Sequence, residues 1–426
     1  MNNEGTPSGS SRLPGFHRLP MAERVRLVAQ SAGLTDEERA ALGVGRPPLE
    51  EVDALSENAI GVLGIPLGVA TNFRVNGRDV LVPMATEESS VVAGASHGAK
   101  MVREGGGFRA ESTDPLMEVQ VCLDDVADPA SAAARVEAER ASLLAEADAC
   151  SRTLPAIGGG ARDLRVRVID GDFGPTVVVH LGVDVRDAMG ANVVNTMGER
   201  LAPRLESLLG GRAVLRVIDN YAVRRIARAR ATVPASAMGG PEAVAGVLRT
   251  FSVARHDVHR AVGHNKGMMN GVTAVVLATG NDTRAFESCA HAYAARTGAY
   301  RPLPVWGRDA KGDLTADLEL PVPVGIVGGL TRAHPTVRAV LKILGVKTAR
   351  ELGEILVCVG LASKLAAEHA LATAGIQRGH MRLHASKLAA LAGAQGAEIA
   401  EVAARLVSGG DITAPRAADI LREIRK

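Results

Sequence analysis

The sequence predicts a mixed α/β (α+β) fold, in which a small ferredoxin-like domain is inserted into a larger domain of helices and strands. The chain has 426 residues, which is enough for two or three domains and a large core. Between residues 116 and 218, strand-like and helix-like patterns follow one another in the order βαββαβ, the ferredoxin-like arrangement. Similar patterns on both sides predict the larger domain, and residues 375–426 predict a separate helical appendage.

Composition excludes several classes of protein. The net charge is only +2 and aromatic residues make up 2%, so neither a basic nor a base-stacking surface for nucleic acid is expected. The four cysteines, Cys122, Cys150, Cys289 and Cys358, form no CxxC pair, and we expect reduced thiols rather than a disulfide or zinc framework. We also see neither an apolar run of about 18 residues nor an opening signal sequence, and expect a cytoplasmic protein without a membrane segment.

The first part of the chain shows clear local signals. Residues 1–11 are rich in Asn, Gly, Ser and Pro, which is typical of a disordered tail. A short amphipathic helix within residues 15–32 should stop at Gly33. Residues 35–38, Thr-Asp-Glu-Glu, form a capping box that opens the next helix. The pair Asn76-Gly77 between two alternating runs predicts a β-hairpin.

A loop that leads into a helix is expected from Met84 to Val102. Glu87 and Glu88 stand at the start of that helix, where a carboxylate suits the helix dipole. If one of them faces inward instead, desolvation raises its pKa, as a general acid near neutral pH requires. Both interpretations stay open on residue type alone.

The inserted domain contains a loop of functional interest. Its strands are expected at 116–123, 164–169, 176–185 and 213–218, and its helices at 131–149, with Ser131 as N-cap, and 191–209. Asp187-Ala188-Met189-Gly190-Ala191-Asn192 joins the third strand to the second helix. Such a loop presents backbone amides at a helix N-terminus, where phosphates bind. No GxGxxG follows a strand, so a Rossmann fold is not expected.

The second half of the large domain is predicted to be mainly helical. Helices are expected at 241–255, 282–296, 335–344 and 349–374, with strands within 305–324. In the C-terminal appendage His380 and His384 stand four residues apart. That spacing suits a metal, but no third ligand is nearby, and we expect no metal site.

Lys266 precedes an almost wholly apolar segment, residues 272–278, and Asp282 follows that segment. A lysine beside a buried segment is unfavourable unless a carboxylate is near. If the chain from Lys266 to the end of this segment is a helix, its ends lie roughly 20 Å apart. The pair then meets only if the chain breaks or folds back at Gly267, Gly271 or Gly280. The alternative is structural: the lysine caps a core helix and the aspartate caps the next one.

Three segments together resemble a known family. They are Met84-Ala85-Thr86-Glu87-Glu88-Ser89-Ser90, Asp187-Ala188-Met189-Gly190-Ala191-Asn192 and Gly379-His380-Met381. They resemble the signature segments of hydroxymethylglutaryl-CoA (HMG-CoA) reductase, and the soluble bacterial class II form fits best. The resemblance runs from about Arg12 to the C-terminus, in the family's order.

This resemblance implies a reaction and four catalytic residues. HMG-CoA is reduced by two nicotinamide cofactors in turn, through a mevaldyl-CoA hemithioacetal and mevaldehyde, to mevalonate and CoA. Lys266 then stabilises the oxyanion, and Glu88, with Glu87 as the alternative, supplies protons. Asp282 couples Lys266 to Glu88, and His380 protonates the departing CoA thiolate. A mobile C-terminal flap would allow the oxidised cofactor to be exchanged.

The resemblance also implies binding residues and an oligomer. The substrate carboxylate is assigned to Arg260, Ser90 and Asn270, and the cofactor to the loop residues Asp187, Met189, Gly190 and Asn192. The site straddles a subunit boundary in the family, so a homodimer or a higher even oligomer is expected.

Cofactor preference is predicted from Ser151 and Arg152. NAD-preferring relatives carry an acidic residue seven positions before the triple glycine, where this chain has Ser151, followed by Arg152. Because the acidic residue is replaced and an arginine follows, we expect the chain to bind NADPH, which carries a 2′-phosphate, in preference to NADH. The alternative is that Arg152 is a solvated charge at a helix end.

The resulting organisation has four parts. They are a tail at 1–11, a CoA- and substrate-binding domain at 12–113 and 221–374, a cofactor-binding domain at 114–220, and a flap at 375–426. Two other functions remain: a degradative NAD-dependent reductase that oxidises mevalonate, and an inactive acyl-CoA-binding regulatory paralogue.

Overall fold

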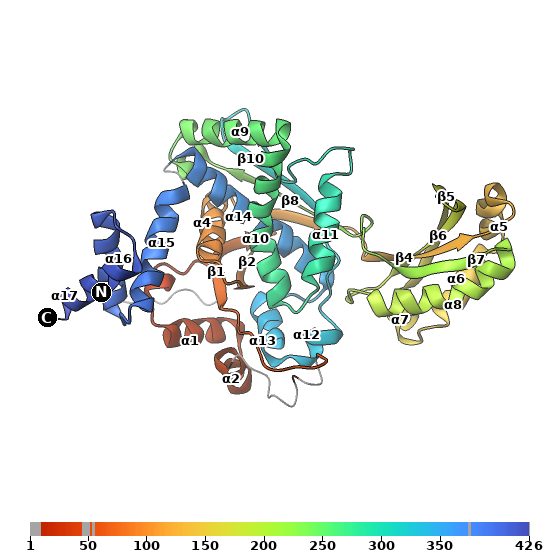
Figure 1. Ribbon diagram of the computed structural model, residues 1–426, viewed down its shortest axis with the longest axis horizontal. Helices are drawn as coiled ribbons and strands as arrows, with labels where there is room; N and C mark the ends of the chain where they lie inside the picture. The colour runs from red at the N-terminus through yellow and green to blue at the C-terminus, as the bar shows by residue number, and fades with distance from the viewer. Residues whose placement is uncertain (1–9, 45–51, 53–55, 374–375, 426) are drawn as a thin grey trace.

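The computed structural model describes residues 10–44, 52, 56–373 and 376–425. Figure 1 shows a large central body, with a small sheet lobe projecting on one side and three C-terminal helices on the other. The mixed helix and sheet fold predicted from the sequence is confirmed. Residues 1–9 of the predicted tail lie outside the described residues.

The large body is built from two separate stretches of the chain. The first contains η1 (Phe16–Arg18), α1 (Met21–Ala32), α2 (Asp36–Val44), β1 (Leu67–Val75), β2 (Arg78–Ala85), α4 (Val91–Glu104) and β3 (Arg109–Ser112). The second contains β8 (Ile226–Val233), η3 (Ala235–Met238), α9 (Pro241–His256), α10 (Val258–Ala278), α11 (Thr283–Ala294), β9 (Val305–Arg308), β10 (Leu314–Pro321), α12 (Gly329–Ala333), α13 (Pro335–Leu344) and α14 (Ala349–Ala372). Strands from both stretches form one antiparallel sheet in the order β3-β8-β10-β9, which joins them into a single body.

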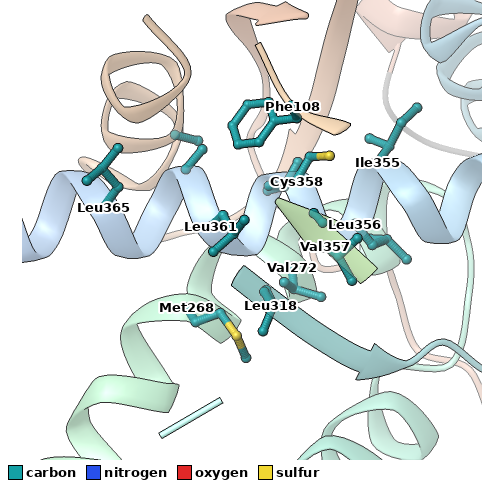
Figure 2. Close-up of a cluster of buried hydrophobic side chains, with 14 of the residues drawn as sticks. Phe108, Met268, Val272, Leu318, Ile355, Leu356, Val357, Cys358, Leu361 and Leu365 are labelled. Atoms are coloured by element: carbon teal, nitrogen blue, oxygen red, sulfur yellow. The ribbon is translucent and has the colours of Figure 1, made fainter. Parts of the chain in front are cut away.

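Helix α14 is the centre of this body. Figure 2 shows its Leu356, Cys358 and Leu361 packed among side chains of α10, β10 and the segment before β3. By length and composition alone, α14 could cross a membrane, although no such helix was expected from the sequence. However, 72% of its most apolar part is buried inside the protein. Its charged residues, Lys364 and Glu368, are buried as well. We therefore describe α14 as the core helix of the large body.

The small lobe has the predicted βαββαβ order. Its elements are β4 (Leu116–Asp124), η2 (Pro129–Ser131), α5 (Ala132–Ala138), α6 (Arg140–Asp148), α7 (Thr153–Ala156), β5 (Gly160–Gly171), β6 (Gly174–Asp184), α8 (Ala191–Leu209) and β7 (Arg212–Asp219). The antiparallel sheet runs β5-β6-β4-β7, which is the ferredoxin-like strand order. The helices pack on one face of this sheet and enclose a second hydrophobic core.

Several local predictions are confirmed. Asn76 and Gly77 both have positive φ in the turn between β1 and β2, as a two-residue hairpin of the primed type requires. Thr35 and Glu38 exchange the two hydrogen bonds of a capping box, at 2.7 and 3.2 Å. Gly33 ends α1 in the left-handed conformation. The C-terminal appendage contains α15 (Ile376–Leu391), α16 (Ala397–Gly409) and α17 (Ala414–Ile424).

Two local predictions were wrong. The helix expected at 131–149 is divided at Glu139, because its halves pack separately against the sheet lobe and Glu139 pairs with Arg204 of α8 at 2.9 Å. Ser131 occupies the predicted N-cap position of α5, but its hydroxyl makes no capping hydrogen bond. The Asp128 carboxylate instead accepts from the Ser131 amide and caps the preceding turn, η2. The disordered tail was predicted too long, since the hydroxyl of the buried Ser11 donates to the Phe73 carbonyl at 2.6 Å.

Candidate active site

Lys266 and Glu88 form the centre of the candidate site. Lys266 lies on α10, and its Nζ is 3.1 Å from Oε2 of Glu88. Asn270, one helical turn further along the same face, places its Nδ2 3.5 Å from the same oxygen. The structure thus brings together three residues that were singled out in the sequence. They define a first half-site: Lys266, Glu88 and Asn270.

The loop between β2 and α4 positions Glu88. Its amide donates to the Thr86 hydroxyl at 3.2 Å, while Glu87 is exposed. Ser90 is the N-cap of α4 with a φ of 82°, and its hydroxyl makes no capping hydrogen bond. A non-glycine residue in this conformation is strained, which is common at functional sites. Of the two glutamates, Glu88 is therefore the one that faces Lys266.

Asp282 does not reach Lys266 within one chain, although both residues belong to the described part. Helix α10 continues unbroken from Val258 to Ala278, so Lys266 lies about 18 Å from its C-terminal end. Asp282 caps α11, accepting from the amides of Arg284 and Ala285, and pairs with the Arg284 guanidinium at 3.0 Å. The structural alternative is correct for Asp282, and its expected coupling to Lys266 and Glu88 is absent within the chain.

Arg260 joins a buried ionic cluster between α10 and α14. The fully buried Glu368 carboxylate is 3.0 Å from the Arg260 guanidinium, 2.5 Å from Nζ of Lys364 and 3.1 Å from Nδ1 of His264. The Thr250 hydroxyl also donates to it. Lys364 and Glu368, four residues apart in an apolar helix, were not predicted as part of the site. Their charges at helical spacing were the available signal.

The cluster carries more positive than negative charge. Burial would raise the pKa of Glu368, but the His264 hydrogen bond and the Lys364 charge lower it well below its usual value. Burial lowers the pKa of Lys364 to about 8, against the attraction of Glu368. Near pH 7 two cations, Arg260 and Lys364, therefore face one carboxylate. The remaining charge suits an anionic ligand at Arg260, which is the more exposed of the two cations.

His264 makes the stability of the protein sensitive to acid. Burial lowers its pKa from 6.5 to about 4, so between these values the unfolded state binds a proton that the folded state does not. Stability then falls as the pH falls. From pH 7 to pH 5 we expect this residue to contribute a loss of about 2 kcal/mol in the free energy of unfolding. Denaturant titrations across this range measure it.

The matched variants are His264→Asn and His259→Asn, the second at an exposed position of the same helix. His264→Asn should flatten the dependence of stability on pH, and His259→Asn should leave it as in the wild type. An unchanged slope in His264→Asn would contradict the assignment.

The predicted cofactor loop, residues 187–192, lies between β6 and α8. Gly190 caps α8 with a φ of 104°, and a β-carbon there would lie 2.6 Å from Val185. The first amides of α8 have no acceptor within their own helix and are available to an anion. The Asp187 carboxylate accepts from the amide of Ala349 at 2.8 Å, and so attaches the loop to the start of α14.

Ser151 and Arg152 lie at the start of α7. The Ser151 hydroxyl accepts from the amide of Leu154 at 3.2 Å, and Arg152 is exposed. The triple glycine after α7 packs against the end of β6, since a β-carbon at Gly159 would lie 2.7 Å from the Asp184 carbonyl. This packing brings the segment close to the beginning of the cofactor loop.

His380 falls within α15, but its side chain lies outside the described residues, as do residues 374 and 375 before the helix. Its predicted role as a proton donor therefore stays a prediction. His384 on the same helix is exposed.

A cluster in the small lobe resembles a metal site in residue type. The ligand atoms of Glu118, His180 and Asp219 lie within 4.8 Å of one another. However, Arg165 donates to Glu118 at 2.5 Å and Arg167 donates to Nε2 of His180 at 2.9 Å. The carboxylate is thus already neutralised and the imidazole lone pair is occupied, so an ion-pair network explains the cluster better than a cation site.

Comparisons with known proteins place the chain among oxidoreductases. The sequence model of hydroxymethylglutaryl-coenzyme A reductase matches residues 20–385. The chain is 46% identical over 417 residues to 3-hydroxy-3-methylglutaryl-coenzyme A reductase of Archaeoglobus fulgidus, covering 98% of this chain and 95% of that protein. It is 35% identical over 337 residues to the probable reductase of Borreliella burgdorferi, covering 78% and 77%. The chain belongs to the HMG-CoA reductase family.

Solved structures agree with this assignment. The HMG-CoA reductase of Streptococcus pneumoniae superposes with a TM-score of 0.82 at 37% identity, covering 96% of this chain and 99% of that one. A structure of the class II enzyme from the same organism, bound to NADPH in open conformations, gives a TM-score of 0.81 at 37% identity, covering 96% and 100%. The resemblance to the class II form that the sequence predicted is confirmed.

Proposed function

We propose that the protein reduces HMG-CoA to mevalonate and CoA with two molecules of NADPH, as a soluble cytoplasmic enzyme of mevalonate metabolism. The observation that carries the proposal is the Lys266–Glu88 pair at 3.1 Å in a chain of this family. The nicotinamide cofactor supplies the hydride when it is bound, and the residues of the chain supply charge and protons.

Lys266 and Glu88 have complementary tasks in this proposal. When the thioester or aldehyde carbonyl is reduced, negative charge develops on its oxygen, and the Lys266 ammonium stabilises that charge. Glu88, which contacts the same ammonium, delivers the proton to the oxygen. Asn270 holds the Glu88 carboxylate from one turn further along α10. His380 protonates the departing CoA thiolate, and the C-terminal helices form the flap.

The substrate carboxylate binds at Arg260 in this proposal. The surplus positive charge of the cluster around Glu368 supports the assignment, because a ligand carboxylate would balance it. Ser90, whose hydroxyl is not used to cap α4, donates a hydrogen bond to the same ligand. The cluster also fixes the guanidinium in place before the substrate arrives.

We further propose that a second copy of the chain completes the site. The second half-site, consisting of the cofactor loop and Asp282, lies beyond the C-terminal end of α10, whereas Lys266 and Asn270 lie near the middle of that helix. Along the face of α10 that carries Lys266, the apolar side chains of Val258, Val262 and Leu277 are exposed. Exposed apolar side chains around an incomplete site favour association of two copies. A homodimer would bring Lys266 of one copy to Asp282 of the other.

The absorbance of the reduced cofactor in the near ultraviolet tests the proposed reaction. With HMG-CoA present, we expect two cofactor molecules to be oxidised for each CoA released, faster with NADPH than with NADH, because Arg152 would pair with the 2′-phosphate. The Arg152→Gln variant should lose most of this preference, whereas Arg249→Gln, at an exposed position of α9, should keep it.

Other outcomes discriminate between the remaining functions. A preference for NADH would contradict the role of Ser151 and Arg152 and would favour the degradative direction. If a folded protein oxidised neither cofactor, an inactive acyl-CoA-binding paralogue would be the better description.

A further inference from the structure

We propose that Arg225 is a positioning residue that fixes the cofactor loop and joins it rigidly to the turn that carries Asp282. The inference rests on the proposed function, in which the loop binds the nicotinamide cofactor. Arg225 itself lies outside the segments that resemble the family's signature motifs, and three observations support its role.

The first observation is the environment of Arg225. Arg225 is only 3% exposed, and its guanidinium forms no ion pair with any described residue. Nη1 donates to the carbonyls of Ala188 at 3.0 Å and Met189 at 3.3 Å, and Nη2 donates to the carbonyl of Val324 at 2.5 Å. Burial lowers the pKa of Arg225 to about 10. Burial disfavours the charged guanidinium, and the charges of Asp187 and Asp184 offset this only in part. The carbonyls of the loop are direct partners of the guanidinium.

The second observation is the direction in which the loop amides point. In a planar trans peptide the N–H points opposite to the C=O of the same unit. Because the carbonyls of Ala188 and Met189 face Arg225, the amides of Met189 and Gly190 face away from it. Arg225 thereby sets the donors that a cofactor phosphate or amide would meet.

The third observation is a hydrogen-bonded connection from the loop to α10 and α11. The amide of Ile326 donates to the Asp187 carbonyl at 2.8 Å. The Asn281 side chain pairs with Gly325 in both directions, at 2.7 and 3.0 Å. A β-carbon at Gly325 would lie 2.4 Å from the Met189 nitrogen, so the contact requires glycine. Since Asn281 directly precedes Asp282, the whole second half-site is one hydrogen-bonded unit.

The test compares Arg225→Met with Arg224→Met. Methionine at position 225 fills part of the space but donates no hydrogen bond, so the loop carbonyls are released. We expect the KM for NADPH and the Kd for NADPH alone, measured by fluorescence, to rise about tenfold or more. The KM for HMG-CoA should stay within about twofold, because the first half-site is untouched. Arg225→Lys, which keeps a charge and donors, should recover part of the affinity.

Arg224→Met is the matched control. Arg224 neighbours Arg225 but points to the sheet of the small lobe, where it pairs with Asp163 at 2.6 Å and Glu118 at 3.1 Å. Its loss should leave both KM values within about twofold of the wild type. An Arg225→Met protein that folds and binds NADPH normally would overturn the proposal.

A second variant covers the case in which Arg225→Met does not fold. Gly325→Ala keeps Arg225 but presses a methyl group against the loop at Ala188 and Met189, and it should weaken NADPH binding with the same selectivity. Gly43→Ala, in an α2 position with open space, controls for the substitution. If Gly325→Ala folds and leaves NADPH affinity unchanged, or raises both KM values alike, the loop is not positioned in this way.

A separate variant distinguishes this inference from the proposed function. Gly190→Val inserts a side chain into the loop itself, where a β-carbon already meets Val185. If a folded Gly190→Val protein binds NADPH normally, the loop is not the cofactor site and the proposed function fails at this point. If it loses NADPH while Arg225→Met does not, only the role of Arg225 is wrong.

Discussion

The Lys266→Ala enzyme should bind HMG-CoA with nearly unchanged KM and lose turnover, with kcat lower by about 10²- to 10³-fold. The Lys266 side chain is exposed, but its ammonium contacts Glu88 in the free protein, so it is already in place before negative charge develops. Its contribution grows as the carbonyl oxygen becomes an oxyanion, and an interaction that strengthens in the transition state appears in kcat. Steady-state kinetics with saturating NADPH measure this separation.

The control for this experiment is Lys311→Ala, which removes an exposed lysine from the turn between β9 and β10. It should retain wild-type kcat and KM. A Lys266→Ala enzyme with near-normal kcat would disprove the proposed mechanism, whereas a rise in KM alone would reassign Lys266 to ground-state binding.

Mixing two inactive variants should restore activity if the site is formed by two chains. Lys266→Ala removes the first half-site and Asp282→Asn removes the second. A heterodimer of the two contains one site with both substitutions and one site with neither. After dissociation and random reassociation of equal amounts, about a quarter of wild-type activity is expected from the symmetry of the dimer. The measurement is cofactor oxidation before and after mixing.

The pair Lys266→Ala and Glu88→Gln provides the matched control. These residues meet within one chain, so each site of their heterodimer keeps one defect, and mixing should restore nothing. If Lys266→Ala and Asp282→Asn also fail to complement while dimers exchange freely, the active site does not combine residues from two copies.

Local signals in the sequence predicted the local structure well. The Asn76-Gly77 turn and the capping box of Thr35 and Glu38 depend on a few neighbouring residues, and both have the expected geometry. The βαββαβ order of the small lobe followed from alternation and helix length in the same way. The choice of Glu88 over Glu87 came from the family resemblance, and the geometry then placed Glu88 beside Lys266.

The glycines of α10 show where sequence reasoning failed. The glycines Gly267 and Gly271 suggest breaks in the chain when the sequence is considered alone, yet the helix is continuous. A β-carbon at Gly271 would lie 2.9 Å from Cβ of Ser363 on α14, so this glycine permits close approach of two helices. That reason depends on a residue 92 positions away in sequence and cannot be found from local pattern. The cluster around Glu368 was missed for the same reason.

The cluster around Glu368 has a consequence for selectivity among acyl-CoA molecules. The unliganded protein already holds two cations, the buried Lys364 and the partly exposed Arg260, against the single carboxylate of Glu368. An acyl group that ends in a carboxylate completes the charge balance, whereas one that ends in a methyl group leaves the imbalance and also removes water from it. If Arg260 binds the substrate carboxylate as proposed, discrimination against uncharged acyl chains is built into the enzyme before any ligand binds.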